Sequence, residues 1–194
     1  MHKRSKMNAK DVIPNSKLES FVNGTNDREA QPKRWVAALV QMNCEKKIGA
    51  KLDKLGVENY VPIQTEIHQW SDRKRKIERV LIPMIVFIKI AKEDELHVRN
   101  YSFIHKFIKN PGSNDLATPI PEDQIQNLKY LLDNSSTEVF FINHLKVGDV
   151  VKIARGPLKG FKGIISIIDN KTQVIAIRID CLGYACVKIS KEFL

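Results

Sequence analysis

Residues 145–165 read LKVGDVVKIARGPLKGFKGII, and they hold the most specific pattern in this 194-residue chain. Runs of branched apolar residues flank a basic turn that contains Gly156, Pro157, Gly160 and Gly163. Glycine permits positive φ angles and close backbone approach, and proline fixes one φ angle of a turn. The stretch therefore predicts two β-strands joined by a tight, positively charged turn.

The residues that follow continue this pattern. Short β-branched runs alternate with turn residues, and we expect strands at Val150–Ile153, Gly163–Ile168, Val174–Ile179 and Ala185–Ile189. Residues 169–171 join the middle pair tightly. Strands spaced by roughly 8 to 12 residues are typical of a small closed barrel, which we place at residues 144–194.

Ahead of the barrel, residues 133–143 begin with a short polar, acidic stretch that has no period, so we expect a linker there. At the other end of the chain, residues 1–32 have few aromatic side chains and no sustained period. Segments of that composition bury too little apolar surface to fold, and we expect a disordered or weakly ordered tail.

Residues 33–132 alternate between strand-like and helix-like periods in the order β-α-β-β-α-β, followed by one more helix. We expect strands at 34–40, 60–70, 77–90 and 103–108, and helices at 43–55, 92–99 and 121–132. Asn43 is the candidate N-cap of the first helix, and Gly56 is its candidate C-terminal stop. The last helix has an expected buried face of Ile125, Leu128, Leu131 and Leu132. This order predicts an α+β, ferredoxin-like domain, in which an antiparallel sheet has helices on one side.

The charge of the chain is strongly positive and unevenly distributed. The net charge of +10 comes from 32 basic and 22 acidic residues. Residues 32–118 carry +6 and residues 144–194 carry +5, while residues 119–143 between them carry −3. Because excess positive charge attracts polyanions, nucleic acid or a nucleic-acid machine is the expected class of partner.

The sequence disfavours several other classes of protein. No apolar run approaches the roughly 18 to 20 residues that span a bilayer, and no apolar signal region follows the first residues, so we expect a cytoplasmic protein without membrane contact. Cys44, Cys181 and Cys186 are too few for a disulfide framework, and buried thiols are the better interpretation of the last two. Five scattered histidines form no metal spacing, and no phosphate loop or nucleophile motif is present. We therefore expect no metal, no cofactor and no enzymatic activity.

The stretch 145–165 closely resembles the KOW motif of NusG-type transcription factors and of several ribosomal proteins. The matching positions are Gly148, Asp149, Arg155, Gly156, Gly160 and Gly163. The same glycines also close a β-barrel, so the motif alone names a fold and no ligand. The resemblance implies that residues 144–194 form an SH3-like barrel.

Residues 33–132 are similar to a NusG N-terminal (NGN) domain. The similarity rests on Arg34-Trp35, on Glu45-Lys46-Lys47 opening a helix, on Val61-Pro62, on a basic hairpin, and on Ile82-Pro83 before Val86-Phe87-Ile88. Three stretches look like the UpxY branch, whose members are encoded with capsular polysaccharide operons. They are SDRKRK at 71–76, LIPMIVF at 81–87 and the late Leu182-Gly183. One departure is Met84-Ile85, where most NusG proteins have Gly-Tyr.

This resemblance implies a processive antiterminator that binds the clamp helices of the largest RNA polymerase subunit through an apolar concavity. The positions it assigns to that concavity are Trp35, Leu39, Ile82, Ile85 and Phe87. The alternative is that these residues form the core of a half-buried sheet, and for Phe87 that alternative is at least as strong. Ile82 and Ile85 are the preferred contacts, because an exposed apolar patch usually marks an interface.

The resemblance also places basic residues near the non-template DNA or nascent RNA of the elongation complex. The candidate side chains are Lys47, Lys51 and Lys54 on the first helix and Arg73, Lys74, Arg75 and Lys76 at the tip of the hairpin. Contacts of this kind with phosphates position a protein without reading a sequence. A solvated helix face and a hairpin that is basic for solubility are the alternatives.

Other functions stay open at this stage. A housekeeping NusG would recruit a Rho-type terminator or a ribosomal protein, and a specialised factor could have a specific antagonist as a partner. A KOW-containing RNA-binding module leaves residues 34–132 unexplained. An RNA-binding domain of the RRM type would need paired aromatic residues on its central strands, and residues 84–87 supply only Phe87.

Overall fold

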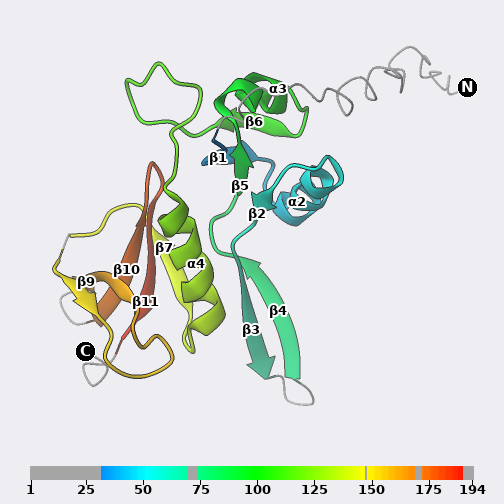
Figure 1. The fold of residues 1–194 in the computed structure, drawn as a ribbon. Helices are drawn as coiled ribbons and strands as arrows, with labels where there is room; N and C mark the ends of the chain where they lie inside the picture. Colours follow the sequence, from blue (N-terminus) through cyan, green and yellow to red (C-terminus); the bar gives the residue numbers. More distant parts are fainter. Residues whose placement is uncertain (1–31, 70–73, 147, 169–171, 190–194) are drawn as a thin grey trace, which may run out of the picture. The chain divides into compact units, whose positions relative to one another are not determined.

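The computed structural model describes residues 32–69, 74–146, 148–168 and 172–189, without the side chains of residues 66–69, 74–76, 168 and 172. The expected tail at residues 1–32 lies outside the described residues, apart from residue 32. Residues 32–194 belong to one unit, and Figure 1 shows the order of its helices and strands along the chain.

The first sheet is antiparallel, with its four strands in the order β2-β5-β1-β6. Its strands are β1 (Arg34–Val40), β2 (Asn59–Tyr60), β5 (Ile85–Ile90) and β6 (Ile104–Phe107). The accompanying helices are α2 (Glu45–Lys54), the 3-10 helix η1 (Lys92–Asp94), α3 (Glu95–Arg99) and α4 (Glu122–Asn134). A separate two-stranded hairpin consists of β3 (Ile63–Gln69) and β4 (Lys74–Val80).

Strand β1 is buried on both faces, and its alternate residues enter two different cores. Val36 and Ala38 pack with Ile48 and Leu52 of α2 and with Val98 of α3. Side chains on the other face of β1 belong to the cluster that contains the buried residues of α4. Helices α2 and α3 thus cover one face of the sheet, as predicted, and the extra helix α4 packs against the opposite face.

The expected long strand at 77–90 is wrong, because the chain breaks between β4 and β5. Pro83 has no N–H to donate to a sheet, and Met84 has a φ of 63°, which no strand residue adopts. The strand expected at 60–70 is likewise divided into β2 and β3, on either side of Pro62. The hairpin therefore leaves the first sheet and forms a ribbon of two strands.

The ends of α2 agree only in part with prediction. Gly56 has a φ of 70°, and Val57 N–H donates to Leu52 O, which is the hydrogen bond of a glycine-terminated helix. At the other end, Cys44 occupies the N-cap position without a side-chain capping bond, and Asn43, one residue earlier, has a φ of 60°. The N-cap predicted at Asn43 is therefore wrong, and the Glu45 side chain instead accepts a hydrogen bond from Asn43 N–H.

The second sheet has five antiparallel strands in the order β7-β11-β10-β9-β8. These strands are β7 (Val139–Ile142), β8 (Val150–Lys152), β9 (Lys162–Ile168), β10 (Thr172–Ile179) and β11 (Gly183–Lys188). The last four match the predicted strands closely, whereas β7 lies inside the segment expected to be a linker. Its residues Val139–Ile142 are apolar and pair with β11, which gives their backbone groups hydrogen-bond partners. Residues 169–171, the predicted tight connection, lie outside the described residues.

Candidate functional site

The apolar positions assigned from the resemblance lie together on the α4 side of the first sheet. Trp35, Ile82, Ile85 and Phe87 are all at most 5% exposed, and Leu39 is half-buried against the same cluster. The cluster also contains Ile125, Leu128 and Leu131 of α4, together with residues of the second sheet. In this structure these side chains therefore belong to a core, and Leu39 is the most accessible of the five.

Trp35 of β1 lies beside the start of α4, among charged side chains and an aromatic ring. Trp35 Nε1 donates a hydrogen bond of 2.8 Å to Glu122 Oε2, and Lys89 Nζ lies 3.0 Å from the same oxygen. Lys129 Nζ lies 5.4 Å from the centroid of the Trp35 ring and 5.0 Å from that of Tyr60. The hydrogen bond from Lys89 lowers the pKa of Glu122, and the same bond raises the pKa of Lys89. Both groups stay charged near neutral pH and form an ion pair between β5 and α4.

The turn before β5 is organised by one buried carboxylate. Glu45 is 3% exposed, and its Oε1 accepts hydrogen bonds from Met84 N–H at 2.8 Å and from Asn43 N–H at 3.2 Å. Met84 and Asn43 both have positive φ angles, so this one oxygen stabilises two unfavourable backbone positions. The sequence pattern marks Glu45 only as an acidic residue that opens a helix. An acidic residue in a first helical turn was the signal, but the pattern does not reveal its distant partner.

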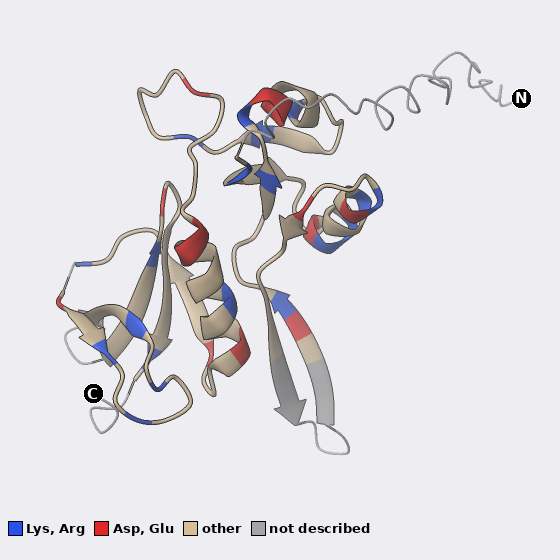
Figure 2. Cartoon of the chain, in the orientation of Figure 1, with Lys and Arg blue, Asp and Glu red and all other residues tan. Residues whose placement is uncertain are grey.

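The predicted nucleic-acid-facing lysines of α2 are exposed on one side of the helix, where Figure 2 marks basic residues in blue. Lys51 Nζ lies 5.3 Å from the centroid of the Phe103 ring, which orients this side chain toward α3 and β6. The opposite side of α2 buries Ile48 and Leu52 in the sheet. The three lysines Lys47, Lys51 and Lys54 are thus available to a partner or to solvent.

The hairpin carries the second predicted basic cluster. Lys74, Arg75 and Lys76 lie in β4, where they pair with Gln69, His68 and Ile67 of β3. Arg73 and the turn itself lie outside the described residues, as do the side chains of the other three. The hairpin tip is therefore shorter than predicted, because β4 begins at Lys74.

The turn between β8 and β9 forms as predicted. Gly156 and Gly160 have φ angles of 85° and 86°, which L-residues rarely adopt. Gly160 N–H donates to Ile153 O, and Ile153 N–H donates to Phe161 O, so the turn is closed at its base. Arg155 is exposed on this turn.

The glycines that flank this turn are required by contact. A Cβ atom on Gly148 would lie 1.8 Å from Ile165 O, and one on Gly163 would lie 2.6 Å from Ile175 Cγ2. Asp149 O accepts a hydrogen bond from Ile165 N–H, which holds the Gly148-Asp149 segment against β9. Gly148, Asp149 and Gly163 therefore have packing roles in the second sheet.

Helix α4 is also the element that joins the first sheet to the second. Tyr130 stacks on Phe161 with ring centroids 5.5 Å apart, and Gln124 Oε1 accepts a hydrogen bond of 2.8 Å from Asp180 N–H. The base of β3 contributes as well, because Gln64 Oε1 accepts from Val139 N–H. The apolar cluster is continuous across these contacts.

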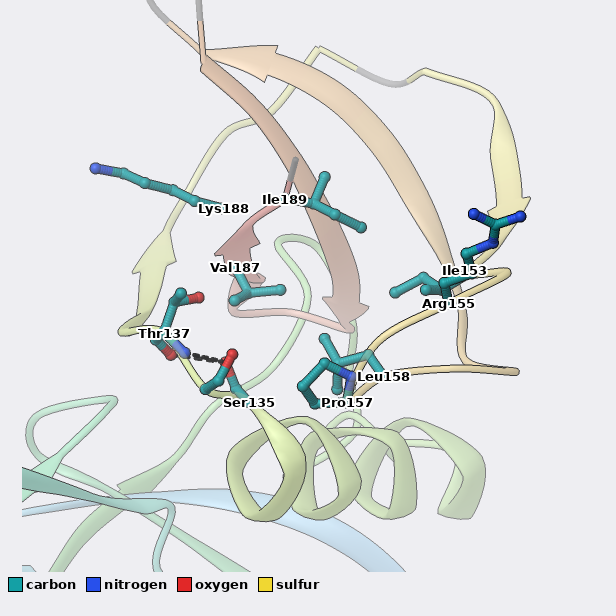
Figure 3. Close-up of a pocket in the computed structure, with 10 residues that line it drawn as sticks. Ser135, Thr137, Ile153, Arg155, Pro157, Leu158, Val187, Lys188 and Ile189 are labelled. Carbon is teal, nitrogen blue, oxygen red and sulfur yellow. Dashed lines mark hydrogen bonds between the residues drawn. The ribbon is translucent and has the colours of Figure 1, made fainter. Parts of the chain in front are cut away.

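A small cavity lies where the end of α4 meets the second sheet (Figure 3). It is lined by Ser135, Thr137, Ile153, Arg155, Pro157, Leu158, Val187, Lys188 and Ile189, among others. Its volume is about 80 Å³, well below the roughly 300 Å³ at which small-molecule sites begin. The cavity can accept a side chain but is too small for a cofactor.

Cys181 and Cys186 are poor candidates for reactive groups. Burial raises the pKa of Cys181 to about 11 and that of Cys186 to about 12, so both thiols stay protonated at neutral pH. Within the described ranges, no group of three or more His, Cys, Asp or Glu side chains is placed to hold a metal ion. The helices of the described residues include none that is both long and apolar enough to span a bilayer.

Comparison with known proteins connects this geometry to a family. A family model described as "Transcription termination factor nusG" matches residues 33–129. A protein of Vibrio vulnificus, "Transcription termination/antitermination protein NusG", is 24% identical over 168 residues, covering 81% of this chain and 91% of that protein. A protein of the same name from Rickettsia conorii is 25% identical over 178 residues, covering 86% and 91%. A crystal structure of the MjSpt4:Spt5 complex, conformation B, matches at 17% identity over 82% of this chain and 93% of that chain, with a TM-score of 0.26.

Proposed function

Because the chain belongs to the NusG family of transcription termination/antitermination proteins, we propose that it binds RNA polymerase during elongation and acts as a processive antiterminator. The observation that carries the proposal is the family match over residues 33–129, which contain the first sheet and every residue of the assigned apolar concavity. The positive charge of residues 32–118 agrees with a partner that holds nucleic acid.

We assign residues 33–132 to a ferredoxin-like NGN domain and residues 144–194 to an SH3-like KOW barrel. The strand order β2-β5-β1-β6, with α2 and α3 on one face, supports the first assignment. The antiparallel order β8-β9-β10-β11 and the glycine turn support the second. Because β7 pairs with β11, we favour a start of the second domain just after α4, earlier in the chain than the expected start at residue 144.

The polymerase contact proposed here is apolar and adjoins the turn at Pro83. Ile85→Asp is a poor test, because Ile85 is 4% exposed and a carboxylate there would disrupt the core. Leu39 is half-buried at the edge of the same cluster, so Leu39→Asp changes the surface with less cost to the fold. If Ile82 and Ile85 contact polymerase directly, the segments of α4 and β7 that accompany them in the core must move.

The experiment is a pull-down of RNA polymerase by the full chain. Leu39→Asp should abolish retention of the polymerase, while circular dichroism shows a folded protein. Leu96→Asp is the matched control, because Leu96 is 58% exposed on α3, outside the cluster. Equal retention by wild type and Leu39→Asp would contradict the proposed contact.

We further propose that the protein serves a polysaccharide biosynthesis operon, as members of the UpxY branch do. The features that support this are Met84-Ile85 after Pro83 and Leu182-Gly183 near the end of the chain. Transcription through an intrinsic terminator and through a Rho-dependent terminator separates the alternatives. A specialised antiterminator increases readthrough at both, whereas a housekeeping factor that recruits Rho increases termination at the second.

A further inference from the structure

A groove lies between α4 and the turn that leads into β9, outside the proposed polymerase contact. Its volume is about 830 Å³, which falls within the range of roughly 300 to 1,000 Å³ common for small-ligand sites. Residues of α4 line one side, and residues 159–162 line the other. Tyr130 and Phe161 meet in its lining.

The groove contains a fixed aromatic platform. The rings of Tyr130 and Phe161 are nearly parallel, with an interplanar angle of 7° and centroids 5.5 Å apart. Phe161 is buried, whereas Tyr130 is 38% exposed. The Tyr130 ring is thus held in place by the ring beneath it and keeps exposed surface. Single-stranded nucleic acids bind by stacking their bases on such rings.

The lining is basic. Lys159 and Lys162 are exposed, and neither forms an ion pair within the described part of the chain. Lys129 also lines the groove, and Asp133 is the one acidic residue among those that line it. A Cβ atom on Gly160 would meet nothing within 4 Å, so the backbone of the turn is open to approach. Positive charge beside an open backbone suits the phosphates of a nucleic-acid strand.

Three amide side chains complete the lining with hydrogen-bonding groups. Gln126 Nε2 donates to Glu122, and Asn134 Nδ2 donates to Tyr130 O, so the amide oxygen of each can still accept. Asn127 is half-buried and lines the same groove. Amide groups bind base edges and the ribose 2′-hydroxyl, which is the group that distinguishes RNA from DNA.

We propose that this groove binds single-stranded RNA, with a base stacked on Tyr130 and phosphates beside Lys159 and Lys162. An acidic peptide would satisfy the lysines but would leave the exposed Tyr130 ring without a stacking partner. The proposal goes beyond the proposed function, since it requires no polymerase and uses residues outside the apolar contact. A loss of polymerase binding and a loss of RNA binding are therefore separate results.

The test is fluorescence anisotropy of the full chain with an unstructured, labelled RNA of about eight nucleotides, which matches the size of such sites. Tyr130→Leu keeps an apolar cover on Phe161 but removes the π face, and affinity should fall about five-fold or more. Tyr130→Phe keeps the ring and should bind like the wild type. DNA of the same sequence should bind more weakly.

The charge test uses two paired substitutions with the same change in net charge. Lys159→Gln with Lys162→Gln should lower the slope of log affinity against log salt by about 1.4, since each phosphate contact in a single strand contributes about 0.7. Lys106→Gln with Lys109→Gln, on β6 and just after it, should leave the slope unchanged. The proposal is overturned if both pairs behave alike, if Tyr130→Leu binds as tightly as Tyr130→Phe, or if DNA binds as tightly as RNA.

Discussion

Replacing Glu45 by alanine should destabilise the protein far more than replacing it by glutamine. Alanine removes the oxygen that accepts hydrogen bonds from Met84 N–H and Asn43 N–H, whereas glutamine retains an equivalent oxygen. Because Glu45 is 3% exposed, water cannot readily replace its side chain at Met84. The two variants differ in size and hydrogen bonding while both remove the charge.

The magnitude follows from the two hydrogen bonds. A bond to a charged acceptor contributes about 1.5 to 3 kcal/mol, which we assign to the shorter Met84 contact, and a longer bond at the exposed Asn43 contributes about 0.5 kcal/mol. The favourable interaction of an acidic residue with a helix N-terminus adds about 0.3 to 1 kcal/mol. We therefore expect Glu45→Ala to lower the free energy of unfolding by about 2.3 to 4.5 kcal/mol. Glu45→Gln should cost about 1 to 1.5 kcal/mol, because the bonds persist without their charge.

Urea unfolding, followed by fluorescence and by circular dichroism, measures the difference. Trp35 is buried in β1 of the first sheet, the sheet that this turn leads into, so its emission reports on the relevant domain. With a denaturant dependence of about 2 kcal/mol per molar urea, Glu45→Ala should move the midpoint down by about 1 to 2 M. Equal midpoints for the alanine and glutamine variants would refute the argument, because the retained oxygen would then have no effect.

Three further predictions concern the second sheet and α4. Gly148→Ala should unfold the second sheet, because the added Cβ would collide with Ile165 O. Amide hydrogen exchange should become faster in the second sheet, while the amides of the first sheet stay protected. Unchanged protection of the second sheet would contradict the contact. The Glu122 pKa is lowered by Lys89, so the stability from this pair is present above the ordinary glutamate pKa and is lost as pH falls through the lowered value. Thermal melts should show that Glu122→Gln removes this dependence of stability on acid pH. The contribution is below about 1 kcal/mol, because the Glu122 side chain is 48% exposed. A variant whose stability follows the same pH profile as the wild type would argue against the pair. Chemical shifts of residues 164–168 and 172–179 should be those of β-strands in the full chain and in a 140–194 fragment alike, because β-branched residues dominate both strands, and helical shifts in either sample would contradict this.

Sequence alone determined the parts of the fold that depend on local chemistry. Alternating and helical periods placed nearly all of the helices and the last four strands, because side-chain polarity repeats with the geometry of each element. The positions of Gly56, Gly156 and Gly160 followed from backbone conformations that disfavour other residues. The buried face of α4 followed from the spacing of Ile125, Leu128 and Leu131.

Tertiary structure alone decided which apolar faces meet. The sequence shows that Ile85 and Phe87 are apolar, but it does not show whether they form a docking surface or a core. In the structure they belong to a core, because buried residues of α4 lie in the same cluster. The positive φ of Met84 is stabilised by a hydrogen bond to Glu45, 39 residues away, and the aromatic platform joins Tyr130 of α4 to Phe161, just before β9. These features arise from contacts between distant segments, whose free energies depend on geometry that no local pattern contains.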